Sequence, residues 1–223
     1  MSFHDALVAQ TTHERNGLLS IPIIQSALAG RIARDDYVAF LTQAFHHVRH
    51  TVPLLMACGA RLPARLEWLR TAVGEYIEEE MGHHEWVLDD IAACGEDRAA
   101  AEASPPSLAT ELMVSYAYDT IQRGNPVAFF GMVLVLEGTS VAIADQAADA
   151  IQQALGLPRK AFTYLRSHGA VDIEHVKFYA DLMDRITDPE EQRVIIHSAR
   201  VFYMLYGNIF RALTASAPAL AAA

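Results

Sequence analysis

Apolar residues recur along the chain at the three- to four-residue spacing of amphipathic helices, and no segment shows the strict alternation of a half-buried strand. Caps, prolines and glycines divide this pattern into about seven helices. One or two short helices extend to residue 30, and the later ones are expected over residues 35–58, 63–94, 107–123, 126–155, 158–186 and 189–214. The pattern therefore predicts an all-α fold, a compact helical bundle.

Proline and glycine suggest where these helices begin, bend and end. Pro53 is expected to kink or end a segment within 35–58, and Gly95 is expected to stop the helix before it. Asn125-Pro126 combines a cap with a proline at the first helical position. Residues 99–106, rich in Ala, Ser and Pro, are interpreted as a loop within one domain that comprises the whole chain, 1–223.

Composition and charge narrow the classes of partner. The chain is 52% hydrophobic, with a formal net charge of -10, so it is expected to repel nucleic acid and anionic lipid. The apolar stretch 126–144 is as long as a membrane span, but Glu137 near its middle favours a buried core helix. Cys58 and Cys94 form no CxxC motif, and the N-terminus lacks signal-peptide features, so a cytoplasmic protein with free thiols is expected.

The strongest chemical signal is the segment His168-Gly-Ala-Val-Asp172-Ile-Glu-His175. On a single helix, positions i, i+4 and i+7 point the same way, and Tyr164 and Tyr179 continue the stripe, which marks it as the buried face. Two imidazoles and a carboxylate are costly in a core unless a divalent metal neutralises them. The spacing therefore predicts metal ligands at His168, Asp172 and His175.

A second signal is the segment Glu78-Glu79-Glu80-Met-Gly-His83-His84. Glu80 and His83 show the Glu-x-x-His spacing of di-iron bundles. Glu79 and His83, at i and i+4, are an alternative pair. His84 points about 100° away on a helix and is expected beside the site or on the surface.

A third signal is Glu137, the one charged residue from 124 to 144. A carboxylate on an apolar face must be neutral, paired with an arginine or bound to metal. Together the three segments offer three carboxylates and three imidazoles. This mixture of oxygen and nitrogen donors, without thiolate, suits iron or manganese better than structural zinc. Two metals bridged by carboxylate, with open positions, make an oxygen-activating site.

The order of these motifs resembles the ligand pattern of the heme-oxygenase-like di-iron oxidases. Residues 45–53 and 82–90 are also similar to this superfamily, which includes thiaminase II (TenA) and pyrroloquinoline-quinone synthase (PqqC). The likeness covers about residues 15–213, and the small-residue tail, 215–223, is expected to be frayed.

The resemblance implies a seven-helix bundle with an internal active site, commonly a homodimer. It implies two Fe(2+) ions per chain, or manganese in place of iron, with these ligands: Glu80, His83 and His168 for one metal, and Glu137, Asp172 and His175 for the other. It further implies an iron-dependent oxidoreductase that uses O2 to oxidise a small, amine- or carboxylate-bearing metabolite. The electron donor is not identified. Leu136 stands where the branch that makes p-aminobenzoate carries tyrosine, so that activity is not expected.

Other functions stay open at this point. A metal-independent, PqqC-like oxidase needs only His, Tyr and Arg around a planar substrate. A heme oxygenase would need a proximal histidine such as His13, and a non-catalytic TenA-like protein would keep the bundle alone. The cysteine nucleophile of thiaminase II follows the chain midpoint, whereas Cys58 and Cys94 both precede it.

Two further sets of residues are candidates for the site wall. Arg49 and Arg166 are candidate contacts for a substrate carboxylate. His46 and His50, at i and i+4, are interpreted as pocket-wall or structural residues, with a ligand pair as the alternative.

Overall fold

The computed structural model describes residues 1–170 and 172–215, except for the side chains of 168–175 and 214–215. The described chain contains helices and no strand, which confirms the all-α prediction. The α-helices are α1 (Phe3–Gln10), α2 (Thr12–Leu19), α3 (Pro22–Leu28), α4 (Arg34–Val48), α5 (Thr51–Arg61), α6 (Glu67–Glu80), α7 (His83–Ala93), α8 (Arg98–Ala103), α9 (Leu108–Arg123), α10 (Phe130–Leu155), α11 (Thr163–Ala170), α12 (Asp172–Asp184) and α13 (Pro189–Ala215). Short 3₁₀ turns, η1 (Ala64–Leu66), η2 (Pro126–Phe129) and η3 (Arg159–Phe162), precede α6, α10 and α11.

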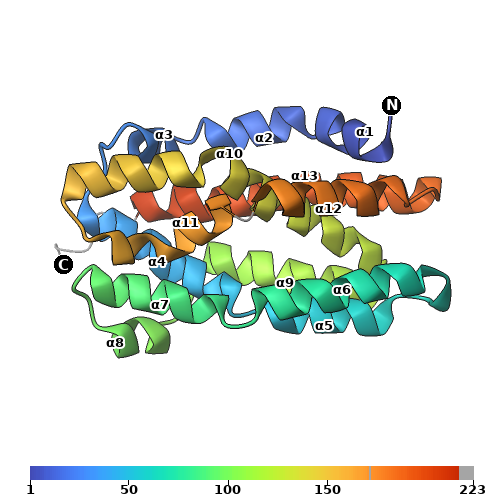
Figure 1. Cartoon of the computed structure of the whole chain (residues 1–223), viewed down its shortest axis with the longest axis horizontal. Helices are drawn as coiled ribbons and strands as arrows, with labels where there is room; N and C mark the ends of the chain where they lie inside the picture. Colours follow the sequence, from blue (N-terminus) through green and yellow to red (C-terminus); the bar gives the residue numbers. More distant parts are fainter. Residues whose placement is uncertain (171, 216–223) are drawn as a thin grey trace, which may run out of the picture.

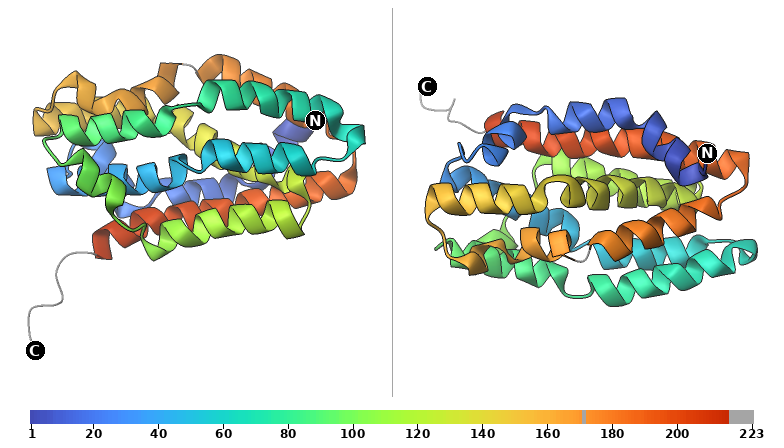
Figure 2. Two further views of the ribbon diagram at one scale, coloured as in Figure 1. Left: turned by 90° about the horizontal axis from the view of Figure 1, so that it is seen from below. Right: turned by 45° about the horizontal axis from the view of Figure 1, so that its top comes forward.

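The long helices run along one common direction (Figure 1). Helices α1 to α3 follow one side of the bundle, and α5, α6 and α7 follow the opposite side (Figures 1 and 2). Helix α10 packs against both α13 and α11, and α13 also packs against α9. Helix α4 packs against α7, and α5 packs against α6. The consecutive helices α4 and α5 therefore face the consecutive helices α6 and α7.

Three segments predicted as single helices are each described as two, which corrects the expected total of about seven. Segment 35–58 becomes α4 and α5, and the break lies ahead of Pro53 because proline is tolerated in the first turn of a helix. Segment 63–94 breaks after α6, where Gly82 has φ of +92° in the left-handed region. Segment 158–186 becomes α11 and α12, and Gly169, a poor helix former, stands near the end of α11.

The predicted loop 99–106 was wrong in its first half, which forms α8. The side chain of Asp97 accepts hydrogen bonds from the backbone N–H groups of Ala99 (2.8 Å) and Ala100 (3.2 Å). Alanine is the strongest helix former, so one cap followed by an alanine run suffices for a short helix. The predicted caps at Ser107 and Asn125 are present: each side chain accepts a hydrogen bond from the first turn that follows it.

Helix α10 forms the centre of the core. The continuous helical segment Pro126–Leu155 is apolar and long enough to cross a membrane by composition, but 61% of its most apolar window is buried inside the bundle. At Gly131 the backbone of α10 closely approaches that of α13. A Cβ added there would lie 2.5 Å from Ala199 N and 2.8 Å from Ile195 O.

Helix α10 also connects two apolar clusters. Its first part, through Val135, belongs to a larger cluster with α5, α6, α9 and α13. Its later part, from Ala144 onward, belongs to a smaller cluster with α4, α7 and α11. The breaks between α4 and α5 and between α6 and α7 therefore fall where the interior passes from one cluster to the other.

A buried carboxylate connects α7 to the start of α11. Asp90 is 0% exposed, and its two oxygens accept hydrogen bonds from the backbone N–H groups of Thr163 (2.9 Å) and Tyr164 (2.8 Å). These N–H groups lie in a first helical turn, where no intrahelical acceptor exists. Burial raises the pKa of Asp90 to about 6, and the two N–H donors act against that rise.

We expect Asp90→Ala to lower the free energy of unfolding by about 2 kcal/mol, because it leaves two buried donors without acceptors. Urea unfolding followed by circular dichroism measures this loss. The matched control is Asp89→Ala, since the Asp89 side chain is 64% exposed and pairs with Arg98 at the surface. The control should change stability by less than about 0.5 kcal/mol. Equal losses in the two variants would contradict the capping role of Asp90.

Candidate metal centre

A cavity of about 70 Å³ lies where the two apolar clusters meet. Its lining residues come from α5, η2, α6, α10, α11 and α13: Thr51, Leu55, Tyr76, Glu80, Phe129, Met132, Val133, Leu136, Glu137, Tyr164 and Tyr206. Tyr164 belongs to the smaller cluster, whereas Tyr76 and Tyr206 belong to the larger one. Two of the predicted ligands, Glu80 and Glu137, thus face the same interior space.

Glu80 and His83 meet across a break between helices. Glu80 is the last residue of α6 and His83 the first of α7, so their spacing is not the helical i, i+3 on which the prediction was based. Because Gly82 is left-handed, the chain turns and brings Glu80 Oε2 to 3.0 Å from His83 Nδ1. Both side chains are largely buried, with 16% and 14% exposed, and the His83 ring stacks on Trp86 at 4.2 Å.

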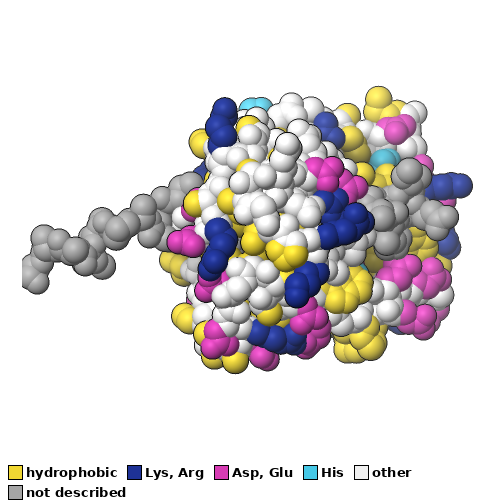
Figure 3. Space-filling model, turned by 60° about the vertical axis from the view of Figure 1, so that its left-hand side comes forward, with side chains coloured by type: hydrophobic (Ala, Val, Ile, Leu, Met, Phe, Trp, Pro, Cys, Tyr) yellow, Lys and Arg dark blue, Asp and Glu magenta, His cyan; other side chains and the backbone are white. Residues whose placement is uncertain are grey.

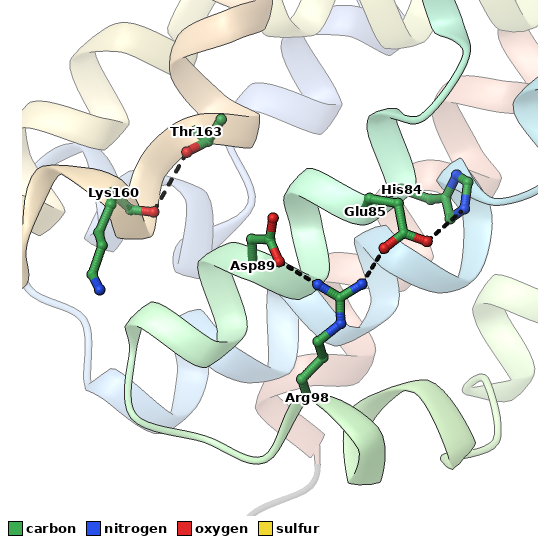
Figure 4. Close-up of polar contacts among 6 residues, drawn as sticks. All are labelled: His84, Glu85, Asp89, Arg98, Lys160 and Thr163. Atoms are coloured by element: carbon green, nitrogen blue, oxygen red, sulfur yellow. Dashed lines mark hydrogen bonds and ion pairs between the residues drawn. The ribbon is translucent and has the colours of Figure 1, made fainter.

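The two neighbours of this pair lie toward solvent. Glu79 is exposed, so the structure favours Glu80 over Glu79 as the carboxylate at the cavity. His84 Nε2 lies 3.3 Å from Glu85 Oε1, and Arg98 joins the same carboxylate in a surface network (Figure 4). Acidic and basic side chains also lie next to each other on the face that Figure 3 shows.

Glu137 is half-buried on α10. It follows the part of that helix that belongs to the larger cluster and precedes the part that belongs to the smaller one. Its negative charge reaches the tyrosines of the cavity. Burial strongly raises the pKa of Tyr76, and the nearby charge of Glu137 raises it further. Burial also raises the pKa of Tyr164, with smaller contributions from Tyr206 and Glu80. Burial therefore keeps these two tyrosines neutral, and the nearby carboxylates act in the same direction.

This donor set fits a bound metal ion. Two carboxylates face a largely apolar space, and none of the described residues that line the space is Lys or Arg. A divalent cation bound between them would neutralise their charge. Oxygen donors with an imidazole suit Fe(2+) or Mn(2+). The buried Tyr76 hydroxyl has no hydrogen-bond partner in the described part of the chain, so it can bond to a group in the cavity.

The other three predicted ligands, His168, Asp172 and His175, have side chains outside the described residues. The backbone places His168 in the last turn of α11, and it places Asp172 and His175 at the start of α12. Both helices pack against α10, the helix of Glu137. Within the described side chains no group of three or more His, Cys, Asp or Glu residues is arranged to hold a metal. The complete six-residue ligand set stays a prediction.

Other histidines considered from the sequence do not line this cavity. His46 Nε2 lies 3.0 Å from Ser104 Oγ, and His50 Nδ1 lies 3.1 Å from Tyr118 Oη. These contacts fit structural roles. His13 is exposed on α2, which does not suit a proximal ligand in a buried heme pocket.

The two candidate arginines also lie away from the cavity, and a third was missed. Arg49 is exposed and lies 5.3 Å from the centre of the Phe45 ring. Arg166 bonds to Asp149 at 2.7 Å, which uses its charge in an ion pair. Arg15, which the sequence did not single out, lines a neighbouring cavity that also includes Glu137.

Comparison with known proteins agrees with this architecture. Residues 38–207 match the family model described as iron-containing redox enzyme. A domain of unknown function with a heme oxygenase-like fold from Shewanella denitrificans has a TM-score of 0.85 and 22% identity, and the match covers 98% of this chain and 97% of that one. The heme oxygenase of Leptospira interrogans has a TM-score of 0.76 and 18% identity, covering 94% and 98%.

A TenA homologue from Pseudomonas syringae has a TM-score of 0.78 and 10% identity, covering 95% of this chain and 92% of that one. No curated protein matches the chain. At these identities the solved structures show the fold, the heme oxygenase-like bundle, and the family model covers most of the chain. The chain belongs to the family of iron-containing redox enzymes.

Proposed function

We propose that this protein is a non-heme di-iron, or iron/manganese, oxidase that uses O2 to oxidise a small metabolite. The observation that carries the proposal is the placement of Glu80 and Glu137 on one interior cavity, with His83 bonded to Glu80. The family match supports iron as the metal. His168, Asp172 and His175 are proposed as the remaining ligands.

The side chains around the cavity have separable roles. When bound, iron supplies the redox chemistry with O2 that amino-acid side chains do not provide. The contact between Glu80 Oε2 and His83 Nδ1 orients the carboxylate and the imidazole before any ligand binds. The Tyr76 hydroxyl can donate a hydrogen bond to a group inside the cavity. Leu55 and Phe129 exclude bulk water, which strengthens these polar interactions.

The homodimer and the cytoplasmic location are further parts of the proposal. They derive from the family resemblance and the cysteine usage.

Anaerobic titration with Fe(2+), followed by rapid mixing with oxygenated buffer, tests the function. We expect about two irons per chain, as in di-iron carboxylate bundles, and a transient visible absorbance after mixing. Glu80→Ala should bind about one iron fewer per chain, because its carboxylate faces the cavity. Glu79→Ala is the matched control and should keep the wild-type stoichiometry, because Glu79 is exposed.

Two outcomes would contradict the proposal in different ways. Loss of iron in Glu79→Ala but not in Glu80→Ala would show that the wrong carboxylate had been assigned. Absence of both iron binding and the absorbance band in the wild-type protein would exclude the di-iron function. The metal-independent, PqqC-like oxidase would then be the leading function.

A further inference from the structure

A second and larger cavity shares Glu137 with the candidate metal centre. Its volume is about 240 Å³, and its wall comes from α1, α2, α10, α12 and α13. Its wall combines aliphatic side chains with polar ones, which include His4, Arg15 and Tyr203. A cavity of about 150 Å³ is sufficient for benzene. This one therefore has room for a small organic molecule next to Glu137.

Arg15 brings a positive charge into the wall of this cavity, and it forms no ion pair with a described residue. Its side chain is half-buried, and its Nε is buried without a hydrogen-bond partner among the described residues. The adjacent carboxylate, Glu14, lies 3.5 Å from the guanidinium group of Arg200 and pairs with that residue. A buried guanidinium N–H without an acceptor is unfavourable, so a ligand that places an acceptor atom beside Arg15 Nε would be stabilised there.

The electrostatics of the cavity limit the charge of that ligand. Arg15 and Tyr203 both line this cavity. Burial raises the pKa of Tyr203 to about 12, the positive charge of Arg15 acts against this rise, and the negative charge of Glu14 adds to it. Glu137 adds a negative charge to the same wall. The two charges cancel in sum, so Glu137 repels a phosphate dianion more strongly than a single carboxylate, which can pair with Arg15. A carboxylate forms a bidentate pair with an arginine.

We propose that this cavity binds the substrate of the oxidase through one carboxylate group, which Arg15 anchors, while the apolar body of the substrate extends toward Glu137. The inference rests on the proposed function, because it places the substrate beside the metal centre. The substrate class is a small monocarboxylic acid with an apolar body. Gly138 also lines this cavity, and a Cβ at that position would meet no heavy atom of the described side chains within 4 Å.

Calorimetric titration of the full-length, metal-free protein with benzoate tests the anchor directly. Benzamide serves as the neutral ligand of equal shape, and inorganic phosphate serves as the competing anion. We expect benzoate to bind at least about tenfold more tightly than benzamide, and Arg15→Gln to remove that preference. The matched control is Arg123→Gln, because Arg123 is 81% exposed on α9 and pairs with Asp119. This control should bind benzoate as the wild type does.

A second variant tests the position of the ligand without changing any charge. Gly138→Leu fills the open space beside Glu137 and should weaken benzoate binding at least about tenfold, while thermal unfolding shows that the helix is retained. Equal binding of benzoate and benzamide, tighter binding of phosphate, or unchanged binding in Arg15→Gln would overturn the proposal. Because these titrations contain no iron, their failure is distinguishable from failure of the iron titration.

Discussion

Replacement of Gly131 by alanine is expected to lower the free energy of unfolding by roughly 3 kcal/mol. The added Cβ would lie 2.5 Å from Ala199 N, 2.8 Å from Ile195 O and 2.9 Å from Ser198 Cβ. Two of these atoms belong to the backbone of α13, so no change of side-chain rotamer relieves the overlap. Helices α10 and α13 must move apart, and the apolar packing between them is then lost.

Gly138→Ala on the same helix is the matched control. The Cβ of alanine at residue 138 would have no heavy atom of the described residues within 4 Å, so the intrinsic preference of the helix for alanine is expected to decide the effect. This control should gain about 0.5–1 kcal/mol. Urea unfolding of both variants measures the difference, and the melting temperature of Gly131→Ala should fall by about 6–12 °C. Similar stability of the two variants would show that α10 and α13 do not approach closely at Gly131.

The second large effect is expected for Glu137→Ala, which removes the carboxylate that both cavities share. This variant should lose at least one of about two irons per chain while its bundle stays folded. At an iron concentration about a hundredfold above the dissociation constant, binding stabilises the wild-type fold by about 2.7 kcal/mol. For a chain of this size that corresponds to about 5–10 °C in melting temperature, and the variant should lose much of this rise.

Metal analysis and thermal unfolding, each with and without iron, check this expectation. Without iron, Glu137→Ala should unfold within about 1 kcal/mol of the wild type, because the variant also loses a costly half-buried charge. Glu111→Ala on α9 is the control, since this carboxylate is exposed and lies outside both cavities. The expectation is contradicted if Glu137→Ala is largely unfolded and its remaining folded fraction binds as much iron as the wild type. Glu137 would then have a structural role.

The sequence predicts the class of fold because helical periodicity and capping residues are local signals. Ser107 and Asn125 cap the segments that they were expected to cap. Helix breaks are harder to predict, because apolar periodicity reports which side of a segment is buried and does not report a local turn. Gly82 gave no clear sign that it would adopt a left-handed conformation, since glycine also occurs within helices.

In the candidate site, too, local sequence patterns identify some residues, whereas others are brought together only by the packing of distant helices. Glu137 could be selected because a carboxylate among apolar neighbours is unusual in any sequence, and Glu80 could be selected by its spacing from His83. Arg15 could not, because it approaches Glu137 only through the packing of α2 and α10 around one cavity, and 122 positions separate the two residues along the chain. Arg49 and Arg166 were selected by their closeness to the motifs in sequence, and the structure places both elsewhere.

The division of the interior into two apolar clusters has a consequence for how small molecules enter. Glu137 lies between the two parts of α10, at the level where the chain breaks between α4 and α5 and between α6 and α7. The carboxylates of Glu80 and Glu137 interrupt the apolar packing at this level, so local opening there should require less free energy than opening either cluster. We expect brief separation of the two halves to admit O2, and hydrogen exchange to be faster at the seam than within the clusters.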